Sequence, residues 1–357
     1  MKNFINIDKS DYINAINLQL GLYYPLKGFA TLGEFESILL KKKLDNIKIT
    51  IPINLFCSKT KSSNFKLGET IDLKYKNEII GSLILDSKFS IDKSNFFLSI
   101  FGTSNKTHLG VNHYLKKIEK KSISLGGRVF VSRDKAKKFF IINNFDMIKK
   151  LKKIKHRDAV FSTRNIPHVG HNLIQKKIIE SKKGLTIFLI LSIKNKYSKK
   201  VLIDSYKALK NNKTFKNINI LFIYLPTFFA GPNEAFFQAK IFENMKFKYF
   251  YVGRDHAGYK SFYKKFDSQE IFEKIKSKIK IIKLNEPMVC NTCEIPIINK
   301  YKNKKSCPLC NGKKLSELNG TDIKILIKRK KKDILLRLLD PFVFNFFKKN
   351  NFSLHIG

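Results

Sequence analysis

Apolar runs that alternate with helical patterns constrain the fold of this 357-residue chain more than any other feature. From about residue 151, strand-like runs occupy 159–163, 185–191, 218–225 and 249–253, and helical patterns begin near 168 and 233. Buried strands that alternate with helices are typical of a parallel sheet in an α/β domain. Ligands bind at the carboxyl ends of such strands. We therefore expect a site in the loops 162–171, 226–234 and 253–259.

The two ends of the chain differ from this pattern. Residues 1–150 contain short strand-like runs, such as 49–54, 70–75 and 79–85, separated by glycine-containing turns, which predicts a β-rich domain with a few helices. The C-terminal end holds a cysteine cluster and a helical tail. The length favours more than one domain. We predict domains at 1–150, 151–285 and 286–357.

The formal net charge of +42 suggests a nucleic-acid binder, but its distribution disfavours that function. Only seven of the 70 basic residues are arginine, the better fork for phosphates and bases, and the excess is spread along the whole chain instead of being clustered. We interpret the charge as a solvated lysine-rich surface. A weaker interpretation is that its field attracts anionic substrates.

Targeting and membrane segments are not evident in the sequence. No apolar run reaches the ~20 residues that span a bilayer, and the first residues lack a signal-peptide core. We expect a soluble, cytoplasmic protein with no membrane partner. The kinase phosphate loop GxxxxGK[ST] is absent as well, so we expect no fused kinase.

Residues 162–171 concentrate groups that suit phosphate binding. Ser162-Thr-Arg-Asn-Ile-Pro-His-Val-Gly-His171 follows a strand and opens a helix, whose N-terminus offers free N–H groups and partial positive charge. The two histidines are three residues apart and can project into one pocket. Arg164 can fork onto an oxyanion, and Asn165 can donate to another oxygen. A nucleotide site is favoured here over a capped helix with two surface histidines.

Two further segments have chemical meaning. In Gly253-Arg-Asp-His-Ala-Gly258, glycines flank a strand-end loop, so backbone groups can contact a base and a ribose; a helix cap is the alternative. Four cysteines form two CxxC pairs separated by thirteen residues, namely Cys290, Cys293, Cys307 and Cys310. This spacing indicates a closed, structural Zn²⁺ site. Unliganded cysteines and a nucleic-acid zinc ribbon are the alternatives.

The segments 162–171 and 253–258 together resemble the ATP sulfurylase (sulfate adenylyltransferase) family. Residues 163–171 are similar to its Thr-Arg-Asn-x-x-His-x-x-His string, which here contains the HxGH pattern of nucleotidyltransferases. Residues 253–258 repeat its Gly-Arg-Asp-His-Ala-Gly without a change. Weaker matches lie at 24–29, 101–111, 125–127, 266–272 and 318–324, so the resemblance covers nearly the whole chain.

This resemblance implies an α/β protein with three parts. They are an N-terminal PUA-like β-rich domain, a central Rossmann-like HxGH nucleotidyltransferase domain with a parallel sheet, and a small C-terminal zinc-containing subdomain. The implied substrates are ATP and sulfate, or another small oxyanion, with Mg²⁺ accompanying ATP. The implied reaction is in-line attack of sulfate on the α-phosphate, which gives adenosine 5′-phosphosulfate and pyrophosphate.

The family's residue roles carry over position by position. Arg164 would contact sulfate and the α-phosphate, Thr163 and Asn165 would orient the phosphates, and His168 and His171 would stabilise the α/β bridge and the leaving pyrophosphate. The residues that would contact adenosine are Gly253, Arg254, Asp255, His256 and Ala257. Ser162 and Asn233 occupy two positions at which the family is expected to hold sulfate.

Ser162 and Asn233 depart from the family, which has Gln and Arg at these two positions. Two further departures are Gln238, where the family commonly has His, and Lys324, where it has Arg. Losing one charge-assisted hydrogen bond costs roughly 1.5–3 kcal/mol, about ten- to a hundredfold in sulfate affinity. Lys240 is one candidate for a compensating charge. A different anionic acceptor and a catalytically silent nucleotide-binding paralogue therefore stay open as alternatives. The sequence does not decide whether the chain forms a homo-oligomer.

Overall fold

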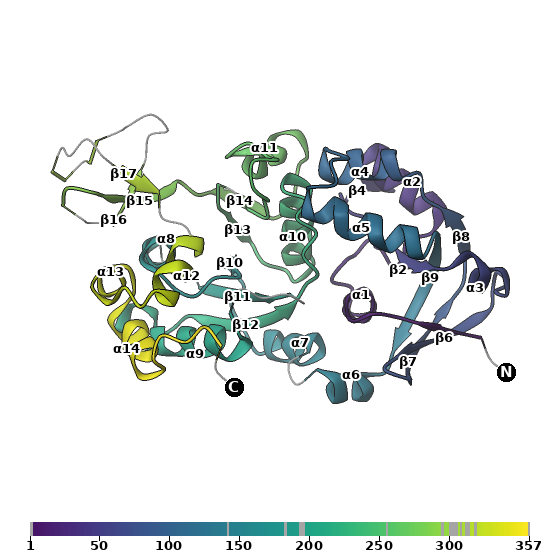
Figure 1. Ribbon diagram of the computed structural model, residues 1–357, viewed down its shortest axis with the longest axis horizontal. Coiled ribbons are helices and arrows are strands. Elements are labelled where there is room, and N and C mark those ends of the chain that lie inside the picture. The colour runs from purple at the N-terminus through teal and green to yellow at the C-terminus, as the bar shows by residue number, and fades with distance from the viewer. Residues whose placement is uncertain are drawn as a thin grey trace. The chain divides into compact units, whose positions relative to one another are not determined.

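The computed structural model describes residues 3–140, 143–181, 184–192, 197–254, 256–293, 296–299, 306–307, 309–310, 315–317 and 320–355 (Figure 1). The chain forms two compact units, one of residues 1–152 and 224–281 and the other of residues 153–223 and 282–357. These units group the chain differently from the domains expected from the sequence, whose boundaries at 150 and 285 stay a prediction.

The strands are short, as expected for the N-terminal part, and their bounds are β1 Phe4–Asn6, β2 Gly28–Phe29, β3 Lys43–Leu44, β4 Ile47–Lys48, β5 Leu55–Cys57, β6 Thr70–Tyr75, β7 Glu78–Ile84, β8 Ser87–Ser90, β9 Ile123–Val131, β10 Ala159–Thr163, β11 Leu185–Leu191, β12 Asn219–Tyr224, β13 Tyr249–Val252, β14 Lys280–Lys283, β15 Glu286–Cys290, β16 Pro296–Asn299 and β17 Leu315–Glu317.

The helices lie between and after these strands, at α1 Lys9–Gln19, α2 Leu32–Lys41, α3 Lys59–Ser63, α4 Lys93–Phe101, α5 Leu109–Lys120, α6 Arg133–Phe139, α7 Asn144–Lys152, α8 Val169–Glu180, α9 Lys199–Leu209, α10 Pro232–Asn244, α11 Asp267–Lys274, α12 Gly320–Lys328, α13 Lys332–Leu338 and α14 Pro341–Lys349, with a 3₁₀ turn at Lys213–Phe215. Among the described residues, none of these helices is long and apolar enough to cross a membrane.

Strand β9 organises the N-terminal sheet, which has seven strands within the described residues (Figure 1). It pairs antiparallel with β2, β5, β7 and β8 along its length, while β6 joins β7 to the parallel edge strand β1. Gly127 sits where these pairings change, at φ 148°, and a Cβ there would lie 1.9 Å from the Ile84 carbonyl oxygen. Only glycine fits a backbone approach this close.

The strand predictions in this part are confirmed except for one. The predicted runs 70–75 and 79–85 form β6 and β7. Residues 49–54 are not a strand, although Ile49, Ile51 and Ile53 are all buried. Pro52 has no N–H for a ladder. The alternation of isoleucines therefore reflects burial and not strand pairing.

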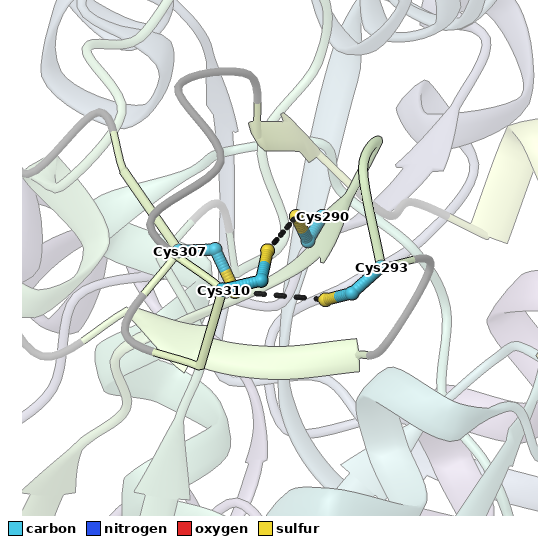
Figure 2. Close-up of side chains that lie close together, drawn as sticks. All are labelled: Cys290, Cys293, Cys307 and Cys310. Atoms are coloured by element: carbon cyan, nitrogen blue, oxygen red, sulfur yellow. Dashed lines mark hydrogen bonds between the residues drawn. The ribbon is translucent and has the colours of Figure 1, made fainter.

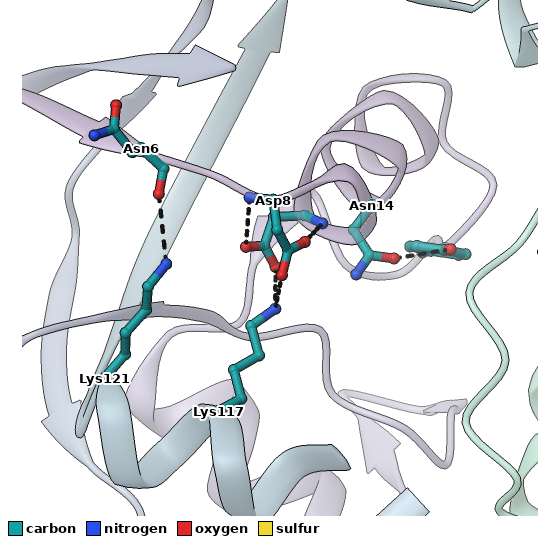
Figure 3. A network of polar contacts seen from close by, with 7 residues as sticks. Asn6, Asp8, Asn14, Lys117 and Lys121 are labelled. Atoms are coloured by element: carbon teal, nitrogen blue, oxygen red, sulfur yellow. Dashed lines mark hydrogen bonds and ion pairs between the residues drawn. The ribbon is translucent and has the colours of Figure 1, made fainter. Parts of the chain in front are cut away.

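A partly buried ion cluster joins α1 and its N-cap residue Asp8 to α5 (Figure 3). The Lys117 ammonium lies 3.2 Å from an Asp8 carboxylate oxygen and 2.5 Å from an Asp11 oxygen, and Asp11 is fully buried. The pKa of Asp11 is raised, because the effect of burial outweighs the lowering effect of Lys117. A buried charge is tolerated only when it is paired, so the cluster specifies how these two helices meet.

The second sheet carries the predicted α/β pattern, with the strand order β12-β11-β10-β13-β14 among the described residues. Strands β10 and β11 are parallel, with Phe161 opposite Ile187, and every residue of β11 is buried. The predicted strands agree with β10 and β11 residue for residue, and with β12 and β13 to within a residue or two at each end. Parallel strands covered on both faces need such continuous apolar runs, so this prediction is confirmed.

The C-terminal helices complete the unit that contains β10 and β11. Helix α14 packs on α9, and the Ser198 amide donates to the Leu354 carbonyl at 2.9 Å. The Asn212 side chain donates to the Asp340 carboxylate at 2.7 Å. Helix α8 contacts β11 as well as β15 and β16, which belong to a sheet of three described strands, β16-β15-β17.

Candidate functional site

The segment between β10 and α8 forms a turn whose backbone is held by the side chain of Thr163. The Asn165 amide donates to the Thr163 hydroxyl at 3.0 Å. His168 is the N-cap residue of α8, and its side chain makes no capping hydrogen bond. The first amides of a helix lack intrahelical acceptors. This turn therefore presents N–H donors and partial positive charge, as phosphate binding requires.

The two histidines meet on the first turn of α8. Their ring centroids are 4.0 Å apart with an interplanar angle of 32°. The ring centroid of Phe161 lies 5.1 Å from that of His171. His168 is 2% exposed, and neither of its ring nitrogens has a hydrogen-bond partner among the described residues. The same holds for Nδ1 of His171. Leaving buried polar atoms unpaired is costly, so these nitrogens are suited to a ligand.

The electrostatics of the pair follow from its burial. Burial, with His171 as a second cause, keeps the pKa of His168 well below its ordinary value, and burial lowers the pKa of His171 to about 4. Both rings are therefore neutral near pH 7. An anion placed beside them would raise both pKa values, because it favours the charged imidazolium.

The other residues predicted for this turn lie around the histidines. Thr163 is 7% exposed, while Ser162, Arg164 and Asn165 are each partly exposed. The structure thus brings all six predicted residues of 162–171 into one strand-to-helix turn. Gly320, at the start of α12 and within the weaker family match at 318–324, also lies against the Asn165 side chain.

In the unit of residues 1–152 and 224–281, the predicted loops 226–234 and 253–259 lie against each other. The Gly231 amide donates to the Ala257 carbonyl at 3.1 Å, and His256 Nε2 lies 2.8 Å from Gln238 Oε1. The Ser268 hydroxyl donates to the His256 carbonyl at 2.6 Å. Ala257 has φ 61°, a strained value for a residue with a Cβ. Of the predicted adenosine contacts, Asp255 lies outside the described residues, and Gly253 and Arg254 are partly exposed.

Asn233, the residue at the family's arginine position, has its side chain engaged within its own unit. Its amide nitrogen donates to the carbonyls of Ser99 and Ile100 at 3.1 and 2.9 Å, at the end of α4. Its carbonyl accepts from the Thr50 hydroxyl at 2.6 Å. The Lys240 ammonium, considered as a replacement charge, is 2.5 Å from the Glu243 carboxylate and largely buried. Lys240 is therefore neutralised by Glu243.

Tyr263 was not identified from the sequence, although it supports the loop before α10. Its hydroxyl donates to the Phe229 carbonyl at 3.0 Å and lies 3.2 Å from Nε2 of buried His108. The Val111 amide donates to the other His108 nitrogen at 3.3 Å. Nothing local marks Tyr263, because its partners lie more than 30 and 150 residues away.

The four cysteines converge as predicted (Figure 2). All four sulfurs lie within 4.8 Å of one another, with Cys290 Sγ 3.6 Å from Cys310 Sγ and Cys293 Sγ 3.7 Å from Cys307 Sγ. These separations are far too long for disulfides. The amides of Thr292 and Leu309 donate to the sulfurs of Cys290 and Cys307 at 3.4 Å. Hydrogen bonding, chiefly from the Cys293 backbone, lowers the pKa of Cys290 to about 6, which favours the thiolate that metals bind.

Known proteins of one family resemble this chain over most of its length. The sequence pattern of the ATP-sulfurylase family matches residues 146–334, and that of the PUA-like domain matches residues 2–134. A sulfate adenylyltransferase of Staphylothermus marinus is 28% identical over 95% of this chain and 91% of its own length. Another, from Carboxydothermus hydrogenoformans, is 30% identical over 92% and 88%.

A solved structure shares the fold. It is that of a hexameric APS kinase from Thiobacillus denitrificans, and it superposes with a TM-score of 0.66 at 14% sequence identity. The likeness covers 98% of this chain, which spans 63% of the length of that protein.

Fold and site together define a nucleotidyltransferase-type α/β enzyme with a PUA-like N-terminal domain and a cysteine cluster that could hold a metal ion. More than half of the chain matches a single family pattern, and relatives of up to 30% identity extend over nearly all of it. The chain belongs to the ATP-sulfurylase family. The predicted family and fold class are thereby confirmed.

Proposed function

We propose that this protein catalyses the reaction of ATP with sulfate to give adenosine 5′-phosphosulfate and pyrophosphate. Membership of the ATP-sulfurylase family supports the reaction. The observation that carries it is the pair of largely buried imidazoles on the first turn of α8, with ring nitrogens that lack partners among the described residues. Such a pair at a helix N-terminus suits a polyphosphate.

In this reaction a sulfate oxygen forms a bond to the α-phosphorus while the bond to the bridging oxygen breaks, and pyrophosphate leaves. No general base is needed, because sulfate is already an anion. The protein therefore contributes positioning and charge stabilisation. Arg164 holds sulfate and the α-phosphate, Thr163 and Asn165 orient the phosphates, and the two histidines stabilise charge on the bridge and the leaving group.

The loop at 253–258 would contact the adenosine of ATP. Its members Gly253, Arg254, Asp255, His256 and Ala257 match the family string, and the contacts of His256 with Gln238 and Ser268 support a fixed loop. A fixed loop binds a base with less loss of conformational entropy. Ser162 and Asn233 would border the acceptor.

Mg²⁺ would accompany ATP without a dedicated protein cage. Mg²⁺ commonly binds through substrate phosphates and water with few protein ligands. Its contribution would be to neutralise phosphate charge during transfer.

Zn²⁺ is the metal that fits the cysteine cluster. A tetrahedral site with Zn–S bonds of about 2.3 Å places its sulfurs about 3.8 Å apart, close to the 3.6 and 3.7 Å separations here. Four thiolates leave no open position for a substrate. Zn²⁺ would therefore be structural. The domain boundaries and the cytoplasmic location stay predictions, and the oligomeric state stays undecided.

The decisive experiment measures pyrophosphate release from ATP and Mg²⁺ with and without sulfate, while the activated product is removed. We expect sulfate-dependent release that Arg164→Ala abolishes without a change in thermal midpoint, because Arg164 supplies the charge that faces sulfate. Arg128→Ala, which removes an exposed arginine on β9, is the matched control and should behave like the parent.

Two outcomes would contradict the proposal. Full activity of Arg164→Ala would remove the assigned sulfate ligand. ATP binding without any sulfate-dependent release would favour another acceptor or a silent paralogue instead, and would direct attention to Ser162 and Asn233.

A further inference from the structure

We infer that Gly320, the first residue of α12, is a positioning residue that sets the orientation of the Asn165 side chain. The inference rests on the proposed function, in which Asn165 orients the phosphates of ATP. Gly320 belongs to a segment that is distant in sequence from the histidine turn, and no chemistry could be assigned to a glycine there from the sequence.

The contact leaves no room for a side chain. A Cβ built on Gly320 would lie 2.5 Å from Cγ, 2.5 Å from Nδ2 and 2.6 Å from Oδ1 of Asn165. These three atoms are its nearest neighbours, and all three belong to the amide group. Real Cβ contacts are not shorter than about 3 Å, because van der Waals repulsion rises steeply below that distance. Any residue other than glycine would displace one of the two partners.

Helix α12 is the less movable of these partners. The Tyr197 hydroxyl, on a residue only 1% exposed, donates to the Gly320 carbonyl at 3.4 Å. Ile323 and Ile327, one turn apart on α12, are both completely buried. Asn165 has a backbone held by the Thr163 hydroxyl, but its amide can turn about two side-chain bonds. Rotating a side chain is cheaper than moving a packed helix.

A side chain at position 320 would therefore re-aim the Asn165 amide and leave the fold intact. The amide offers both a donor and an acceptor, so a rotation changes which group faces a phosphate oxygen. Misplacing a group that orients the reacting phosphates by about 1 Å costs up to about a hundredfold in rate. The effect should thus be kinetic and not a loss of stability.

The test compares Gly320→Ala with Gly33→Ala, a matched control. Gly33 also lies in the first turn of a helix, α2, and a Cβ there would meet nothing within 4 Å. We expect Gly320→Ala to lower kcat/KM for ATP about ten- to a hundredfold, with no fall in thermal midpoint, since alanine favours helix more than glycine. Gly33→Ala should keep the parent kinetics.

A double-mutant cycle with Asn165→Ala isolates the pair. Without the amide, the Cβ of residue 320 has space, so Asn165→Ala and Asn165→Ala/Gly320→Ala should have the same kcat/KM. Parent kinetics for Gly320→Ala would overturn the inference. So would an equal loss in both backgrounds, or a lowered thermal midpoint, because either would show that Gly320 supports the fold.

Failure of the proposed function has a different pattern. If Asn165→Ala keeps full sulfate-dependent activity, then Asn165 does not orient the phosphates, and the inference falls with that role. If the parent shows no sulfate-dependent release, kcat/KM cannot be measured. Calorimetry then measures the ATP affinity in place of kcat/KM. An ATP affinity that is unchanged in Gly320→Ala would overturn the inference.

Discussion

His168 and His171 illustrate how single residues record a function in their surroundings. A neutral imidazole that is buried without partners destabilises the folded chain, and in the described residues His168 has neither ring nitrogen paired. A structural histidine would have hydrogen-bond partners for its ring nitrogens, as His108 has in the Val111 amide and the Tyr263 hydroxyl. This difference between the two environments supports the proposal that His168 binds a ligand, whereas His108 stabilises the fold.

A pH dependence of stability follows from His171. Its pKa of about 4 in the folded chain lies below the ordinary 6.5, so the unfolded chain binds more protons between these values. Stability is therefore lost as the pH falls from 6.5 towards 4. Partial exposure of the ring reduces the effect, and we expect roughly 1–2 kcal/mol between pH 7 and pH 5.

His171→Gln should remove the part of the stability loss at low pH that the His171 ring causes. The measurement is the free energy of unfolding by urea at pH 7 and pH 5, with exposed His355→Gln as the control that retains the parent's pH dependence. An identical pH dependence in parent and His171→Gln would show that the ring is not held neutral by burial.

At the scale of elements, the cysteine cluster supports the helix that the histidine turn opens. Strands β15 and β16 pack against α8, and the cluster buries Cys290 and Cys307 together with Ile297. So small a sheet has little apolar core of its own, and a structural metal commonly supplies the missing stability. A metal held by the four cysteines would therefore be connected through the small sheet to the histidine turn, within one unit.

Removing the metal should therefore affect the site as well as the fold. We expect about one Zn²⁺ per chain by elemental analysis, and expect a strong chelator to lower both the thermal midpoint and the activity, because α8 loses its support. Cys310→Ser should reproduce both losses. Cys57→Ala, which removes the buried thiol of β5, should retain zinc. A chelated protein with full metal loss and parent activity would refute this connection.

For the whole molecule, the net charge of +42 is the dominant long-range property. ATP and sulfate are anions, and a strongly positive surface raises their rate of encounter without any specific contact. Salt screens such interactions, since the Debye length falls from about 30 Å at 0.01 M to about 8 Å at 0.15 M.

Raising KCl from about 0.02 to 0.3 M should accordingly lower kcat/KM for ATP several-fold while kcat changes little. Steady-state kinetics at matched ionic strengths measure this, with potassium glutamate in place of chloride as the control against competition by chloride. A salt-independent kcat/KM would mean that the lysines are only a solvating surface.

The sequence by itself determined the strands of the parallel sheet, the histidine turn, the cysteine site and the family. The first three depend on short stretches of sequence: β11 is a run of seven buried residues, six of them apolar, and residues 162–171 and the CxxC pairs hold their groups at fixed spacing. Over about ten residues the backbone has few regular conformations, so the local pattern of residues is enough to predict the structure.

Only the tertiary structure decided which of these groups are engaged elsewhere. Asn233 directs its amide to carbonyls more than 130 residues away, Lys240 is neutralised by Glu243, and the isoleucines of 49–54 are buried without strand pairing. The contact of Gly320 with Asn165 joins residues that no local pattern relates. Such contacts depend on packing, because close-packed interiors bring together segments whose separation in sequence carries no information about their distance in space.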